Sequence, residues 1–266
     1  MENVIDPKLT KPNVSTIAEV DQLGPLEIKT SIGQQRTLEN LVKEFKRAMS
    51  DANLNGQRFL HAEALLGSIQ HHDFIPWDDD ADFKLHIKHR QAVQTALKKL
   101  APRLHTYAMW QRDKLYFAPF NSSILLTPYT IGSHSVNRYN LGDIFPLAYR
   151  PLGKEWLPVP RRPISFLKSY YGNKVQVCKS QGWSHATESA SKLVVVDCRK
   201  LMDKYPFVHQ CRIPEHKSRR RQSGMCDEYL VNGSGQVFHK IRLPLDVDEC
   251  ESSFYTVRHE SFRCHE

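Results

Sequence analysis

The chain has 266 residues, a formal net charge of +8 at pH 7, and 40% hydrophobic and 25% charged residues. This composition is that of a globular protein and excludes a collagen-like or repeat polymer and an extended disordered chain. The length allows one large or two small domains, and the positive charge favours phosphate esters, nucleotides or other acidic partners. Because no run approaches the ~18 consecutive apolar residues of a membrane span, we expect a soluble chain with no span.

The first part of the chain is predicted to be an arm followed by alternating helices and strands. Residues 1–33 carry several prolines among scattered polar residues, which is typical of a loosely docked arm. From 34 to 49, apolar residues recur at three- and four-residue steps and predict an amphipathic helix. A short strand at 58–61, a brief buried helix at 64–69 and a strand at 80–87 follow, the last with clean apolar–polar alternation.

The remainder reads as a mixture of short elements that becomes less regular after residue 190. Periodicity, turn residues and the boundary residues Pro163 and Gly172 carry these expectations. The expected elements are helices at 89–100 and 164–171, hairpin strands at 107–110 and 115–120, and strands at 123–126, 139–145 and 194–196. Beyond them the sequence is polar, rich in turn residues and marked mainly by cysteines.

All six cysteines lie in the last third of the chain, at positions 178, 198, 211, 226, 250 and 264. None is spaced as a Cys-x-x-Cys knuckle, so a zinc site is not expected. Clustered cysteines in even number, together with Asn-x-Ser sequons at Asn13, Asn121 and Asn232, favour disulfides and the lumen of the secretory pathway (Golgi) over the cytoplasm. The basic run at 217–221 has no interleaved aromatics, so we interpret it as a solvated loop rather than a nucleic-acid surface.

Four aspartates fall within the five positions 78–82, flanked by Trp77 and Phe83 rather than by further charges. In a strand, Asp80 and Asp82 share one face at about 6 to 7 Å, since side chains alternate and each residue rises ~3.3 Å. A cation can bridge two such carboxylates, and oxygen ligands suit Mg²⁺ or Mn²⁺ with substrate phosphates completing the coordination. The pattern predicts a phosphoryl-transfer site; a solvated acidic turn or a structural calcium loop is the alternative interpretation.

Three other features are candidates for the same site. Gly67 and Ser68 form a small-residue turn upstream of the aspartates, whose backbone N–H groups could approach a phosphate. Asp143, in the strand expected at 139–145, is predicted to be a third metal ligand or a general base, or else a hydrogen-bonded structural aspartate. Trp77 could stack on a cytosine base, although an aromatic beside a proline also suits packing.

The run from Ala64 to Ser68 and on through Phe74 to Asp82 resembles the signature of the LicD family, to which fukutin-related proteins also belong. Asp143 to Leu147 and Tyr170 to Gly172 resemble two later family landmarks, so the resemblance covers about residues 35 to 180. It implies an α/β (α+β) polymerase-beta-like nucleotidyltransferase fold, a mixed sheet with flanking helices. It also implies Mg²⁺-dependent transfer of a phosphorylated alcohol, phosphocholine- or phosphoribitol-like, from a CDP-linked donor to a glycan acceptor.

Carried over by position, the resemblance gives each candidate a role. Asp80 and Asp82 resemble the metal ligands, Asp78 an auxiliary carboxylate of the metal site, and Asp143 a third acid. Gly67 and Ser68 resemble part of the phosphate-facing turn. The implied organisation is an arm at 1–33, a nucleotidyltransferase-fold domain at 34–190 and a cysteine-containing extension at 191–266.

The sequence departs from the family pattern at two positions that matter for chemistry. Glu63 stands where the family usually has glycine, and Gln70 where it often has arginine. A carboxylate beside a donor phosphate is repulsive, and Lys84 or Arg58 could replace the missing basic contact. The alternative function is therefore a catalytically inactive relative that binds a glycan or nucleotide as an interaction module. Nucleic-acid nucleotidyl transfer lacks a recognition motif, so nucleic acid is not the expected partner.

Overall fold

The computed structural model describes residues 24–28, 30–108, 112–117, 123–129, 139–172, 177–184, 189–213, 223–246, 248–250 and 262–264. Most of the predicted arm and the basic run at 217–221 lie outside these residues. In the described part of the chain, no helix has both the length and the apolar character needed to cross a membrane.

A five-stranded mixed sheet forms the centre of the fold, in the order β1-β2-β5-β4-β3. The strands are β1 (Arg58–Leu60), β2 (Asp80–His86), β3 (His105–Ala108), β4 (Asp113–Tyr116) and β5 (Ser123–Tyr129). Strand β2 runs parallel to β5, with Asp80 opposite Ser123, and the other neighbours are antiparallel. The predicted mixed sheet and the hairpin of β3 and β4 are confirmed.

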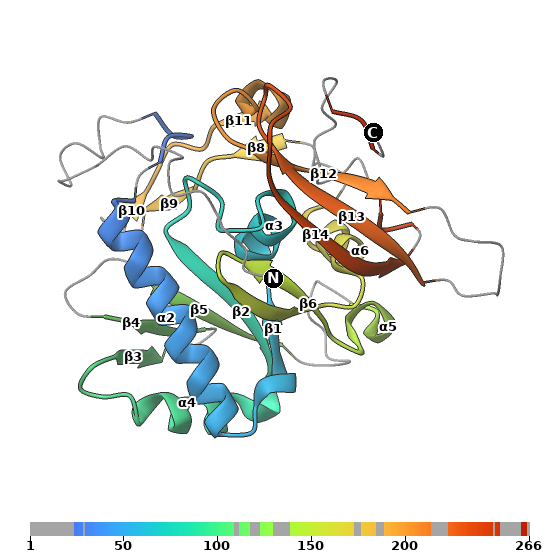
Figure 1. The fold of residues 1–266 in the computed structure, drawn as a ribbon. Helices are drawn as coiled ribbons and strands as arrows, with labels where there is room; N and C mark the ends of the chain where they lie inside the picture. The colour runs from blue at the N-terminus through green and yellow to red at the C-terminus, as the bar shows by residue number, and fades with distance from the viewer. Residues whose placement is uncertain are drawn as a thin grey trace.

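Helices flank this sheet, as expected for the fold class. Figure 1 shows α2 (Ile32–Asp51) crossing the sheet, with α4 (Arg90–Lys98) near the C-terminal end of α2. Helices α3 (Ala62–Gln70) and α6 (Pro163–Tyr171) pack against each other. Helix α2 begins two residues before the predicted start because Ser31 and Gln34 form a capping box. Its buried residues are Leu38, Leu41, Val42, Phe45, Ala48 and Met49, which include every apolar position of the predicted stripe.

The strand predicted at 139–145 is wrong, because this segment forms the short helix α5 (Leu141–Ile144). The side chain of Asn140 accepts a hydrogen bond from the Gly142 N–H at 3.0 Å, and this cap starts a helical turn. Pro146 cannot continue the helix. The hairpin of β6 (Ala148–Leu152) and β7 (Glu155–Val159) follows.

A second antiparallel sheet, in the order β12-β13-β14, occupies the C-terminal region where the sequence predicted no sheet. Its strands are β12 (Phe207–Arg212), β13 (Ser223–Val231) and β14 (Val237–Asp246). Figure 1 shows it to one side of the central sheet, next to α6. Strand β12 was not predicted because its buried positions include His209 and Gln210, so its sequence does not alternate between apolar and polar residues.

Two small ribbons and three disulfides complete this region. Strand β8 (Val177–Lys179) pairs with β11 (Val195–Asp197), and β9 (Trp183–Ser184) pairs with β10 (Ser189–Ala190). Single-turn 3-10 helices lie at η1 (Asn55–Gln57), η2 (Ile87–His89) and η3 (Cys198–Leu201). The disulfides are Cys178–Cys198, Cys211–Cys264 and Cys226–Cys250, so all six cysteines are paired and the expected disulfides are confirmed.

A buried polar network joins the C-terminal sheet to the first part of the chain. The carboxylate of Glu228 on β13 accepts two hydrogen bonds from the Arg150 guanidinium, at 3.0 and 2.6 Å. It also lies 3.0 Å from His72 Nε2 and accepts a 2.7 Å bond from Gln210. Burial alone would raise the pKa of Glu228, but the charge of Arg150 and the contact with His72 outweigh it and hold the pKa at about 2. The network fixes the C-terminal sheet against β6 and the loop after α3.

Candidate active site

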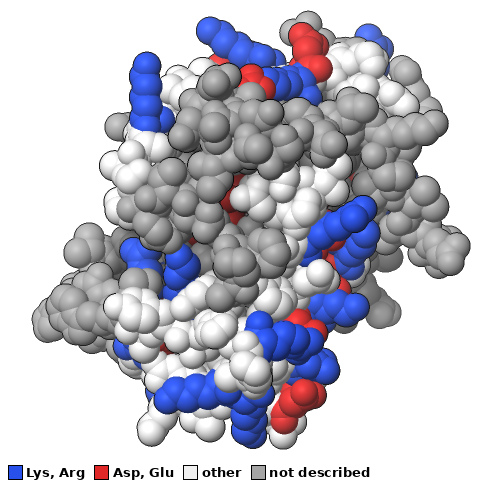
Figure 2. All heavy atoms as spheres, turned by 90° about the vertical axis from the view of Figure 1, so that its left-hand side faces the viewer, with Lys and Arg blue, Asp and Glu red and all other residues white. Residues whose placement is uncertain are grey.

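Strand β2 presents polar side chains on one face and apolar side chains on the other. The buried apolar set is Ala81, Phe83 and Leu85. Because side chains alternate along a strand, Asp80, Asp82 and Lys84 share the opposite face, and all three line a cavity of about 600 Å³. The alternation read from the sequence therefore placed these side chains correctly. Figure 2 shows acidic atoms at the bottom of a recess, with Lys and Arg side chains around it on the surface.

The walls of this cavity come from parts of the chain that are far apart in sequence. The start of α3 contributes His61 and Glu63, the end of α6 contributes Tyr170 and Tyr171, and the segment at 177–183 closes another side. Sequence reasoning did not assign that segment or Glu63 a role in binding. The sequence offered no signal for the segment, because the pairing of Cys178 with Cys198 is known only from the structure, and the departure from the family pattern was the signal for Glu63.

Gly67 and Ser68 are not among the described residues that line the cavity, and they do not form the predicted turn. Both lie inside α3, and Ser68 is fully buried. A Cβ on Gly67 would stand 2.6 Å from the carbonyl oxygen of Asp73 and 2.8 Å from the backbone nitrogen of Ile75. Gly67 is therefore required for packing, because the loop that leads to the aspartates runs directly against the helix.

Three carboxylates converge where the loop enters β2. One oxygen each from Asp78, Asp79 and Asp80 lies within 4.8 Å of the others. The side-chain amide of Gln181 donates to Asp78 Oδ1 at 2.6 Å and to Asp79 Oδ1 at 2.7 Å. Asp78 Oδ2 is buried and has no hydrogen-bond partner among the described residues. An acceptor left buried without a donor is costly, so this atom is suited to a cation.

The electrostatics of the cluster also favour a cation. Burial raises the pKa of Asp78 well above its usual range, and the neighbouring charge of Asp80 raises it further. The pKa of Asp82 is raised well above its usual range by the same two causes. Neighbouring carboxylates in a desolvated site oppose one another's ionisation, and a divalent ion would relieve that repulsion. The carboxylates present therefore fit a divalent cation: Asp78 and Asp80 belong to the converging cluster, and Asp82 lines the same cavity.

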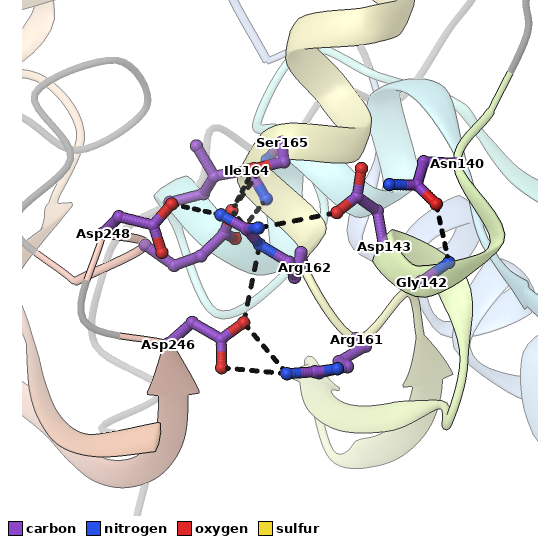
Figure 3. Close-up of polar contacts among 10 residues, drawn as sticks. Asn140, Gly142, Asp143, Arg161, Arg162, Ile164, Ser165, Asp246 and Asp248 are labelled. Carbon is purple, nitrogen blue, oxygen red and sulfur yellow. Dashed lines mark hydrogen bonds and ion pairs between the residues drawn. The ribbon is translucent and has the colours of Figure 1, made fainter. Parts of the chain in front are cut away.

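Asp143 is not among the described residues that line the cavity, which corrects its expected role as third acid. It lies in α5, and its carboxylate is 3.7 Å from Arg162 Nη1. Figure 3 shows Asp143 directed toward Arg162, in a cluster with Asp246 and Asp248. The expected placement failed because the segment turns into a helix instead of running as a strand beside β2.

Glu63 is the carboxylate outside the aspartate loop that lines the cavity. Burial raises its pKa, the nearby Tyr171 hydroxyl acts in the opposite direction, and the charge of Asp80 raises it again. The pKa of Tyr171 is raised well above its usual range, first by burial and then by Glu63. Glu63 and Tyr171 thus interact within the cavity that the aspartates also line.

The basic and aromatic residues of the site divide between binding and packing. Lys84 lines the cavity, and burial lowers its pKa to about 8 while the charge of Asp82 acts against that change. Trp77 is only 2% exposed, and its indole Nε1 donates to the Lys179 carbonyl at 2.7 Å. This supports the packing interpretation of Trp77. Trp183 and Tyr170, which also line the cavity, are 46% and 37% exposed and offer aromatic surface to a ligand.

Residues 55–120 match the family model described as LicD/FKTN/FKRP, nucleotidyltransferase domain. The matched segment contains β1, α3, β2 and the aspartates, and the match confirms the resemblance seen in the motif. It supports an enzyme of the phosphotransferase and nucleotidyltransferase type. No curated protein sequence matches the chain.

Parts of the chain are similar to several solved structures. ANT(2″)-Ia in complex with adenylyl-2″-tobramycin is 10% identical, covers 50% of this chain and 73% of its own, and has a TM-score of 0.37. Lincosamide antibiotic adenylyltransferase LnuA, lincomycin-bound, is 13% identical, covers 48% of this chain and 84% of its own, and has a TM-score of 0.33. Terminal uridylyl transferase 4 from Trypanosoma brucei is 9% identical, covers 40% and 38%, and has a TM-score of 0.25.

Proposed function

We propose that this chain is a Mg²⁺-dependent transferase that moves a phosphorylated alcohol, phosphocholine- or phosphoribitol-like, from a CDP-linked donor to a glycan acceptor. The observation that carries the proposal is the buried, unpaired Asp78 Oδ2 beside Asp80 and Asp82 at one end of a 600 Å³ cavity. The family match over residues 55–120 supports the transferase class. The donor, the acceptor and the metal are the parts that experiment must test.

The residues of the chain can be given roles in an in-line displacement. Mg²⁺ supplies neutralisation of phosphate charge when bound. Asp78, Asp80 and Asp82 hold the ion, and Lys84, on the same face of β2, directs positive charge to the donor phosphate. Tyr170 and Trp183 provide surfaces for the donor or for a sugar ring and exclude water.

The acceptor hydroxyl must lose a proton as its oxygen attacks the phosphorus and cytidine monophosphate leaves. Glu63 is the residue that we assign to accept this proton, because it lines the same cavity without belonging to the aspartate loop. Its burial raises the pKa, which makes the carboxylate a better proton acceptor once it is ionised. This assignment replaces the one expected for Asp143.

Calorimetric titration with CDP-choline and CDP-ribitol, with and without Mg²⁺, tests the proposal. The variant is the double substitution Asp80→Asn/Asp82→Asn, and Asp51→Asn at the exposed end of α2 is the matched control. We expect Mg²⁺-dependent binding that the double variant loses and the control keeps. Equal binding by the double variant would refute the metal-site assignment.

A second candidate function is favoured by the position of Glu63. A carboxylate that faces the donor phosphate repels it, and the Gln181 amide already bonds to Asp78 and Asp79. These features also suit an inactive relative that binds a glycan or nucleotide without transfer. Glu63→Gly separates the two functions: loss of turnover with binding retained supports the proton-acceptor role, whereas tighter donor binding with no turnover in either protein supports the inactive relative.

We further propose that the protein works in the lumen of the secretory pathway, in the Golgi. The support is chemical, because three disulfides persist only under oxidising conditions and glycan acceptors are modified there. Co-localisation of a tagged full-length protein with Golgi markers tests this, and a cytosolic protein with six reduced thiols would contradict it.

A further inference from the structure

Helix α6 has no N-terminal cap of its own. Its N-cap residue is Arg162, whose side chain offers no acceptor, and Pro163 at the first helical position has no N–H. The next two N–H groups, of Ile164 and Ser165, donate to the two carboxylate oxygens of Glu249 at 2.8 and 2.9 Å. The Ser165 hydroxyl donates to the same carboxylate at 2.6 Å. The cap is therefore supplied by a residue 85 positions later in the chain.

Arg162 adds ionic contacts that hold the same end of the helix. Its guanidinium lies 3.7 Å from Asp143, 3.5 Å from Asp246 and 3.8 Å from Glu249, and it donates to Asp248. Figure 3 shows Arg162 at the centre of these acidic side chains, which come from α5, from the last residue of β14 and from the segment after it. Glu249 itself is 1% exposed, so its bonds to α6 are shielded from water.

Glu249 is held in place by the chain around it. Its N–H and that of Cys250 both donate to the Asp246 carbonyl, at 2.8 and 3.3 Å, and form a tight turn at the end of β14. Cys250 is joined by a disulfide to Cys226 on β13. The carboxylate thus belongs to the C-terminal sheet, while the groups that it binds belong to α6.

The other end of α6 reaches the cavity. Tyr170 and Tyr171 are the last two residues of the helix and both line the site. The ring of Tyr170 packs edge-on against His61 at 4.4 Å between centroids, and Tyr171 faces Glu63. A nine-residue helix moves as one rigid body, so a displacement at its N-terminus is transmitted to these two rings.

We propose that Glu249 is a positioning residue: through α6 it sets the place of Tyr170 and Tyr171 in the cavity, and the Cys226–Cys250 disulfide makes this placement depend on the redox state of the protein. The inference rests on the proposed function for its effect on turnover, but not for its effect on the tyrosines. Small displacements of groups that orient a substrate lower rates by up to about 100-fold.

The test compares Glu249→Ala, Glu249→Gln and Glu249→Asp in the full chain, with Asp51→Asn at the exposed end of α2 as the control, because Asp51 is not among the residues that contact the start of α6. We expect kcat/KM with the CDP-linked donor to fall by about 10- to 100-fold in Glu249→Ala, less in Glu249→Gln, and to recover partly in Glu249→Asp. Mg²⁺ binding, measured by calorimetry, should stay within twofold of the wild type, since the aspartates lie on β2 and its loop. The control should keep full activity.

Two further readouts separate positioning from a general loss of structure. Combined with Tyr171→Phe, the Glu249→Ala change should add little, because both act on the same ring; independent losses that multiply would overturn the proposal. Nitration of Tyr170, followed by mass spectrometry, should become several-fold faster in Glu249→Ala and in the paired substitution Cys226→Ser/Cys250→Ser, which removes this disulfide alone. This readout needs no turnover, so an unchanged nitration rate overturns the positioning role even if the proposed reaction proves wrong.

Discussion

Acidification should destabilise the protein through Glu228, and the size of the effect follows from its buried network. The pKa of this carboxyl is about 2 in the folded protein, against an ordinary value of 4.5. Because the folded pKa is the lower one, the unfolded chain binds the proton first as pH falls. The stabilisation is fully present above about pH 5 and is lost progressively toward pH 2. The difference between the two pKa values corresponds to a loss of about 3 kcal/mol in the free energy of unfolding.

Replacement of the charge tests the same network at neutral pH. Glu228→Gln leaves the buried Arg150 guanidinium without its counter-ion, which typically costs about 3–5 kcal/mol. Glu155→Gln is the matched control, since Glu155 pairs with Lys46 at 2.7 Å on the surface and such pairs contribute at most about 1 kcal/mol. Urea unfolding at pH 7, 4.5 and 3 measures both variants. If Glu228→Gln loses no more stability than the control, or keeps the wild-type pH dependence, the reasoning is refuted.

Two further predictions concern the walls of the cavity. Gly67→Ala places a Cβ 2.6 Å from a backbone carbonyl oxygen, so it should cost about 1–3 kcal/mol in thermal unfolding and weaken Mg²⁺ binding by displacing the aspartate loop; unchanged Mg²⁺ affinity would contradict the packing role. Removal of the Cys178–Cys198 disulfide by paired serine substitutions should raise KM for the donor, because it frees the wall at 177–183. Removal of Cys211–Cys264, which does not line the cavity, should leave KM unchanged, and equal effects on KM would refute the assignment.

The central sheet and strand β2 could be predicted from the sequence. The spacing of apolar residues, every second residue in a strand and every three to four residues in a helix, is a local property of the chain. Asp80 and Asp82 could be assigned to one face of β2 from alternation alone, and α2 from its apolar stripe. The C-terminal sheet could not be predicted from the spacing of apolar residues. Strand β13 buries Glu228 and β12 buries Gln210, at positions where a buried strand usually has apolar residues. Glu228 is satisfied by Arg150 and His72, which are distant in sequence, and Gln210 donates to Glu228.

The acidic residues that line the cavity could be named from the sequence, but the residues that form its other walls could not. Asp78, Asp80 and Asp82 stand close together in the sequence, and their shared chemistry identified them. Tyr171 and Gln181 reach the cavity only through the packing of α6 and the disulfide-linked ribbon, which no local pattern encodes. Asp143 was misplaced for the same reason, because a role in the site needed a strand where a capped helical turn forms.

The cap on α6 also bears on how the protein is made. Chains emerge from the ribosome N-terminus first, and domains generally begin to fold in that order. The aspartates and the two tyrosines have been synthesised once the chain reaches residue 171. Glu249, whose carboxylate caps α6, is synthesised 85 residues after Ile164 at the start of the helix. The strand and loop that carry the aspartates can therefore fold early in synthesis. Tyr170 and Tyr171 reach their final position only after the residues that follow β14 have been synthesised.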